Sequence, residues 1–66
     1  MVRILVQKFV AVEEGVSKYY LECALDSGST PPEGNWITGS LALDVDNAKI
    51  QAYSEVSDEW KDLMTF

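Results

Sequence analysis

The sequence predicts a small all-β fold, an antiparallel meander of about five short strands in two hairpins joined by a proline- and glycine-containing loop. β-Branched residues are frequent in the stretch 2–12, which favours a strand. Side chains in 16–25 and again in 40–46 alternate between apolar and polar, as in strands with one covered face. The 66 residues are expected to form one small domain, 1–66.

The first two strands are expected to form a hairpin, because Gly15 permits the positive φ of a type I turn closed by a bulge. The pairs expected from this turn are Val12 with Val16, Phe9 with Tyr19, and Leu5 with Cys23. One face then holds Leu5, Phe9, Tyr19, Leu21, Cys23 and Leu25. The other holds Val2, Ile4, Val6, Val10, Val12, Val16 and Tyr20. Both faces are largely apolar, so we expect another molecule to cover one of them.

The loop 26–38 leads to a second hairpin, in which 40–46 pairs with 49–55. The expected neighbours on one face are Val45 with Ile50 and Leu43 with Ala52. A further turn at 57–59 and a last short strand at 60–64 complete the meander. Apolar residues of the C-terminal third also recur at helical spacing, which supports an alternative α+β fold with a helix from Asn47 to Met64.

The composition argues against several classes of function. A net charge of −6 and a pI near 4.2 do not suit nucleic-acid binding, which uses Lys and Arg against phosphates. The apolar N-terminal stretch is interrupted by Arg3 and Lys8 and is too short to span a membrane. No export signal and one free thiol suggest a reducing cytoplasm. One cysteine permits no internal disulfide, and the chain has no histidine.

Catalytic and metal-binding chemistry is not expected either. The carboxylates at Asp44 and Asp46 lack the further oxygen ligands that a calcium loop requires. Cys23 falls on the inward side of a strand, where a thiol packs and does not react. Ser40 has no evident base. We therefore expect neither an enzyme, nor a cofactor, nor a small-molecule substrate.

The second half of the chain resembles short structural proteins encoded in the virion gene clusters of tailed phages and prophages of Gram-positive bacteria. The matching residues are Gly39, Ser40, Ala42, Asp44, the turn at Asn47 and Ala48, Ile50, Tyr53, Glu55 and Trp60, preceded by a similar loop containing Pro31 and Thr38. Ala48 stands where that family has glycine, and positive φ would strain alanine. A four-residue turn through Asp46 to Lys49 is therefore expected there.

The resemblance implies a non-enzymatic virion protein that binds itself or a larger capsid, neck or tail protein, found in the virion or in the host cytoplasm before assembly. The alternative is a small acidic inhibitor of a host defence or DNA-acting protein, since six acidic residues lie between Asp44 and Asp62. Apolar and aromatic side chains left at the surface are typical interface anchors. The candidate partner-binding residues are Val2, Ile4, Val6, Val10, Tyr20, Trp36, Tyr53 and Trp60.

Overall fold

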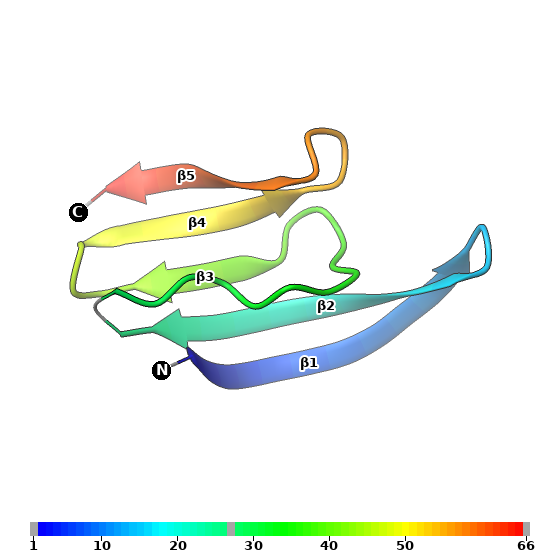
Figure 1. Ribbon diagram of the computed structural model, residues 1–66, viewed down its shortest axis with the longest axis horizontal. Coiled ribbons are helices and arrows are strands. Elements are labelled where there is room, and N and C mark those ends of the chain that lie inside the picture. Colours follow the sequence, from blue (N-terminus) through cyan, green and yellow to red (C-terminus); the bar gives the residue numbers. More distant parts are fainter. Residues whose placement is uncertain (1, 27, 66) are drawn as a thin grey trace.

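The computed structural model describes residues 2–26 and 28–65, and these form one five-stranded sheet in the order β1-β2-β3-β4-β5 (Figure 1). The strands are β1 (Val2–Glu13), β2 (Val16–Leu25), β3 (Leu41–Asp44), β4 (Lys49–Ser54) and β5 (Glu59–Thr65). The molecule is flat, with principal extents of 36 × 21 × 15 Å. The strands therefore form a single layer.

The all-β prediction is confirmed, and the alternative of a C-terminal helix is wrong because β4 and β5 occupy that stretch. The expected pair of hairpins forms one continuous sheet, in which β2 and β3 run parallel and all other neighbours are antiparallel. Parallel neighbours need a long crossover connection. The crossover loop, which we define as residues 28–40, provides it by running back across β2 and β3 (Figure 1). Ser27, in the predicted loop, lies outside the described residues.

The first hairpin turns one residue later than expected. Glu13 pairs with Val16, and the two residues between them, Glu14 and Gly15, have φ values of 52° and 78°. Positive φ at both central residues defines a type I′ turn, whose twist matches that of the flanking strands. The expected pairing of Val12 with Val16 and the type I turn with a bulge are therefore wrong.

Two β-bulges in β1 then change the register along the hairpin. The extra residues are Val10 and Leu5. Val10 brings the register back to the expected pair Phe9–Tyr19. Leu5 shifts it again, so that Ile4 and not Leu5 pairs with Cys23. Each extra residue moves the following side chains to the opposite face. As a result Val2, Ile4 and Val12 share the face of Cys23, contrary to expectation. Val6, Val16 and Tyr20 lie on the other face, as expected.

The second hairpin keeps the expected faces but shifts its register by two residues. Leu43 pairs with Ile50 and Leu41 with Ala52, because the loop spans Val45–Ala48 and not the expected four-residue turn through Asp46 to Lys49. The last loop residue, Ala48, has φ 54°. A shift of two leaves every side chain on its predicted side. The loop before the final strand spans 55–58 and not the expected 57–59, so the strand begins at Glu59, and Trp60 pairs with Tyr53 across this loop.

The crossover loop covers one face of the sheet and creates the core. Trp36 of the loop packs with the buried side chains of β2 and β3, and Asn35 and Ile37 hydrogen-bond to the backbone of Tyr19. The buried apolar residues are Leu21, Cys23, Leu25, Trp36 and Ala42. Where the loop bends into β3, the fully buried Ser40 accepts a hydrogen bond from the Leu21 amide at 3.1 Å. The described chain has no helix long and apolar enough to cross a membrane.

Candidate functional site

The face of the sheet opposite the crossover loop, which we call the open face, has no covering layer within residues 2–26 and 28–65. By the strand register and the alternation of side chains, its centre is apolar. Its apolar residues are Val6, Ala11, Val16, Tyr20, Ala24, Leu41, Leu43, Ile50, Ala52 and Met64. Leu41, Leu43 and Ile50 remain only half-buried, and Met64 is 56% exposed. A face of this kind is a site for docking, because contiguous exposed apolar surface is uncommon on isolated soluble proteins.

The charges are divided unequally between the two sides of the sheet. The same register places Arg3, Lys8, Lys18 and Lys61 on the open face, that is, four of the five basic residues of the chain. Their acidic neighbours there are Glu13, Glu22 and Glu59. The open face is thus close to neutral although the protein carries a net charge of −6. Like-charge repulsion therefore opposes docking through this face much less than the total charge suggests.

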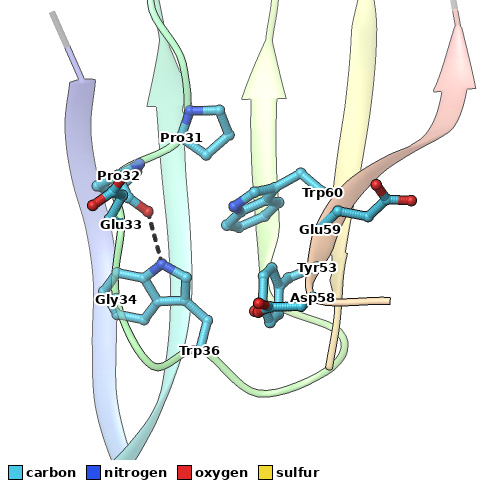
Figure 2. A pocket seen from close by; sticks show the side chains of 9 residues that line it. All are labelled: Pro31, Pro32, Glu33, Gly34, Trp36, Tyr53, Asp58, Glu59 and Trp60. Carbon is cyan, nitrogen blue, oxygen red and sulfur yellow. Dashed lines mark hydrogen bonds between the residues drawn. The ribbon is translucent and has the colours of Figure 1, made fainter. Parts of the chain in front are cut away.

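On the opposite side, a second feature lies between the crossover loop and the β4–β5 hairpin. It is a cleft of about 330 Å³, which we call the aromatic cleft (Figure 2). Its lining residues are Pro31, Pro32, Glu33, Gly34, Trp36, Tyr53, Asp58, Glu59 and Trp60. Three aromatic rings that are far apart in the sequence are brought together here. Two carboxylates, Glu33 and Asp58, accompany them, while the Glu59 side chain points away from the cleft (Figure 2).

The aromatic walls are held in place by specific contacts. The Trp36 indole N–H donates to the Pro32 carbonyl at 2.9 Å (Figure 2). A Cβ at Gly34 would lie 2.6 Å from the Trp36 ring, so the close approach of the loop to this ring requires glycine. On the other wall, the Tyr53 and Trp60 rings meet edge to face with centroids 5.4 Å apart. The cleft is therefore largely formed before any ligand arrives.

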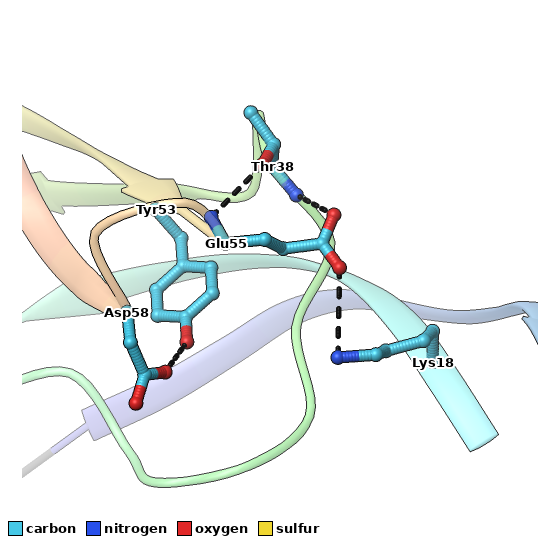
Figure 3. A network of polar contacts seen from close by, with 5 residues as sticks. All are labelled: Lys18, Thr38, Tyr53, Glu55 and Asp58. Carbon is cyan, nitrogen blue, oxygen red and sulfur yellow. Dashed lines mark hydrogen bonds and ion pairs between the residues drawn. The ribbon is translucent and has the colours of Figure 1, made fainter. Parts of the chain in front are cut away.

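One carboxylate of the cleft is bonded to an aromatic residue. Asp58 has φ 53° at the end of the 55–58 loop, and it accepts a hydrogen bond from the Tyr53 hydroxyl (Figure 3). This bond favours the protonated phenol and raises the pKa of Tyr53 to about 12. The phenol is thus a neutral hydrogen-bond donor at physiological pH. Its bond to Asp58 fixes the carboxylate beside the ring.

A second polar network, centred on Glu55, connects the same hairpin to the crossover loop. The Glu55 carboxylate accepts a hydrogen bond from the Thr38 amide at 3.0 Å, and the Glu55 amide donates to the Thr38 hydroxyl at 2.9 Å (Figure 3). Lys18 lies 3.5 Å from the same carboxylate. The Thr38 amide, with a smaller contribution from Lys18, lowers the pKa of Glu55. This network ties the start of the β4–β5 loop to the end of the crossover loop.

The chemically reactive groups of the chain lie outside both surfaces. Cys23 is fully buried, and burial raises the pKa of its thiol, which disfavours the nucleophilic thiolate. Ser40 completes the hydrogen bonding of β2 and is likewise fully buried. Among the described residues, no group of three or more acidic, Cys or His side chains is placed to hold a metal ion. The two surfaces therefore offer binding contacts, through apolar area, aromatic rings and carboxylates.

The candidate partner-binding residues divide between the two sides of the sheet. Val6 and Tyr20 lie on the open face, while Val2 and Ile4 lie on the loop side, and Val10 is an extra residue of a bulge. Trp36, Tyr53 and Trp60 meet in the aromatic cleft. Sequence reasoning missed the carboxylates of the cleft and the central open-face residues of β3 and β4. The alternation of side chains placed Leu43 and Ile50 on the same side of the sheet, and this pattern could have identified them as part of an apolar surface. No pattern in the sequence predicted the contact between Asp58 and Tyr53.

Comparison of the chain with protein-family models, with curated proteins and with solved structures gives no match in any of the three. The class that the fold defines is a small one-layer β-sheet protein with an open apolar face and an aromatic cleft on opposite sides. Its function is therefore argued from these two surfaces.

Proposed function

We propose that the protein is a non-enzymatic structural protein of a tailed phage or prophage that works by docking through its open face. The partner is a second copy of the chain, a larger virion protein of the capsid, neck or tail, or both in turn. The observation that supports the proposal is the uncovered apolar centre of the sheet, with half-buried Leu41, Leu43 and Ile50. The virion context rests on the resemblance of the second half of the chain.

Energetic reasoning supports a partner on this face. The buried apolar side chains of the described chain are Leu21, Cys23, Leu25, Trp36 and Ala42. A domain of this size rarely has more than ~3–5 kcal/mol of stability from its core alone. Packing a second layer about 10 Å from the open face would remove its apolar side chains from water, at roughly 25 cal/mol for each Å². The near-neutral charge of the face permits such a contact.

The alternative, an acidic inhibitor that imitates nucleic acid, has less support. Several of the six carboxylates between Asp44 and Asp62 are engaged within the protein. Asp44 is buried and bonds to Asn47, Glu55 bonds to Thr38, and Asp62 lies 3.6 Å from Lys49. The loops after β3 and after β4 also lie at opposite ends of the sheet (Figure 1). A regular row of exposed negative charge, as phosphate mimicry needs, is therefore not formed by these residues.

Incorporation into particles tests the proposal. A tagged copy should co-purify with virions from an induced lysogen, and Leu43→Lys should abolish this because it places a charge at the centre of the open face. Val45→Lys is the matched control, since it adds the same charge at a loop position that is 66% exposed. Equal incorporation of the two variants would refute docking through the open face. Salt-sensitive binding to a host DNA-acting protein, without incorporation, would favour the inhibitor.

A further inference from the structure

We propose that the aromatic cleft binds the guanidinium group of an arginine side chain on a partner polypeptide. The cleft lies on the loop side of the sheet, so this second site is distinct from the open face and goes beyond the proposed function. The inference rests on three properties of the cleft: its aromatic walls, its surrounding negative charge and its prior organisation.

The walls suit a flat cation. Trp36 stands on one side of the cleft, and Trp60 and Tyr53 stand on the other (Figure 2). Cations bind over the faces of Trp and Tyr rings, and arginine does so more often than lysine because its planar group stacks on them. A volume of about 330 Å³ is near the lower end of the range of ligand pockets, roughly 300–1,000 Å³. It suits one side chain and not a folded segment.

The charge of the cleft selects for a cation. Glu33 and Asp58 supply its negative charge, and its lining contains no basic residue. Asp58 receives the Tyr53 hydroxyl on Oδ1, and Oδ2 has no bond among those described. The Glu59 side chain points away from the cleft, and its carboxylate lies 3.9 Å from Lys61 of the open face, so it does not face the ligand (Figure 2). Carboxylates accept the forked hydrogen bonds of a guanidinium, which strengthens the case for arginine.

Little ordering is needed when the ligand binds. Trp36 is held by its hydrogen bond to the Pro32 carbonyl and lies close against Gly34, and Trp60 is packed against Tyr53. A prolyl segment is the other ligand that aromatic grooves accept. Such a ligand would leave the two carboxylates of the cleft without a role. The arginine side chain uses both the rings and the charges.

The test is an NMR titration with N-acetyl-arginine amide, observed at the indole N–H signals of Trp36 and Trp60. The neutral isostere, N-acetyl-citrulline amide, should bind on the order of tenfold more weakly, because it lacks the charge that the rings and carboxylates attract. N-acetyl-lysine amide should also bind more weakly, since its ammonium group does not stack. The double variant Glu33→Gln/Asp58→Asn should lower the affinity for the arginine amide several-fold.

The matched control is Glu13→Gln/Glu14→Gln, which removes the same charge at the far end of the first hairpin. It should leave the affinity within about twofold of the unmodified protein, because exposed charges are screened over roughly 10 Å at 0.1 M salt. The proposal is overturned if citrulline amide binds as tightly as arginine amide, or if both double variants weaken binding equally. A prolyl peptide that moves the same indole signals more strongly than the arginine amide would also overturn it. None of these outcomes bears on the open face.

Discussion

Ser40→Ala should destabilise the protein by an amount that is large for so small a domain. The Leu21 amide donates to Ser40 Oγ at 3.1 Å, and both residues are fully buried. The crossover loop bends at this point, where the backbone partner of β2 changes from Trp36 to β3. The Ser40 hydroxyl supplies the acceptor for the Leu21 amide there. Without it, a buried amide loses its partner, at a cost of about 1–3 kcal/mol. That is a large part of the ~3–5 kcal/mol that a core of this size provides.

Urea denaturation at one fixed protein concentration, followed by tryptophan fluorescence, measures this cost. The midpoint should fall while the slope stays the same, because the surface exposed on unfolding is unchanged. Ser17→Ala is the matched control, since Ser17 is exposed on the same strand and its loss should change stability by less than about 0.5 kcal/mol. Equal midpoints for the two variants would show that the buried hydroxyl does not complete the sheet.

Three further predictions concern single residues. The hydrogen bond from the Tyr53 hydroxyl to Asp58 should stabilise the fold fully below pH 10, the ordinary pKa of a tyrosine, and this stabilisation should be lost as the pH rises toward the raised pKa of Tyr53, about 12. Thermal unfolding across this range should show a smaller loss of stability for Tyr53→Phe than for the unmodified protein. Identical losses would contradict the assignment. Cys23 should react with a thiol reagent only at the rate of unfolding, and rapid labelling of the native protein would be inconsistent with its burial. Ala48→Gly should raise stability by up to about 1 kcal/mol in urea denaturation, because φ of 54° strains alanine, and a lower midpoint would argue against that backbone.

The sequence was sufficient for the strands and for many of the faces, because alternation of side chains survives errors in register. The β3–β4 register was wrong by two residues, and Leu43 and Ile50 nevertheless lie together as expected. In β1 the same reasoning failed, because the bulges at Leu5 and Val10 each add one residue and reverse the alternation. Nothing in this stretch of β-branched residues marks the position of a bulge.

The parallel pairing of β2 with β3 was also beyond the sequence. It depends on Trp36 packing against β2 and on the hydrogen bonds of Asn35 and Ile37 to Tyr19, which are long-range contacts. The aromatic cleft follows from that arrangement, because the crossover loop brings Trp36 opposite Trp60. The rings were identified as interface anchors from residue type alone. Their meeting beside two carboxylates required the topology.

Sedimentation equilibrium of the unmodified protein over a range of concentrations tests the central claim, docking through the open face, most directly. We predict reversible self-association that Leu43→Lys abolishes and Val45→Lys preserves, because only the first residue lies at the centre of the apolar face. Circular dichroism of the same samples shows whether each variant keeps its sheet. A stable, folded monomer at every concentration, with the open face exposed to water and no partner protein required, would contradict the claim.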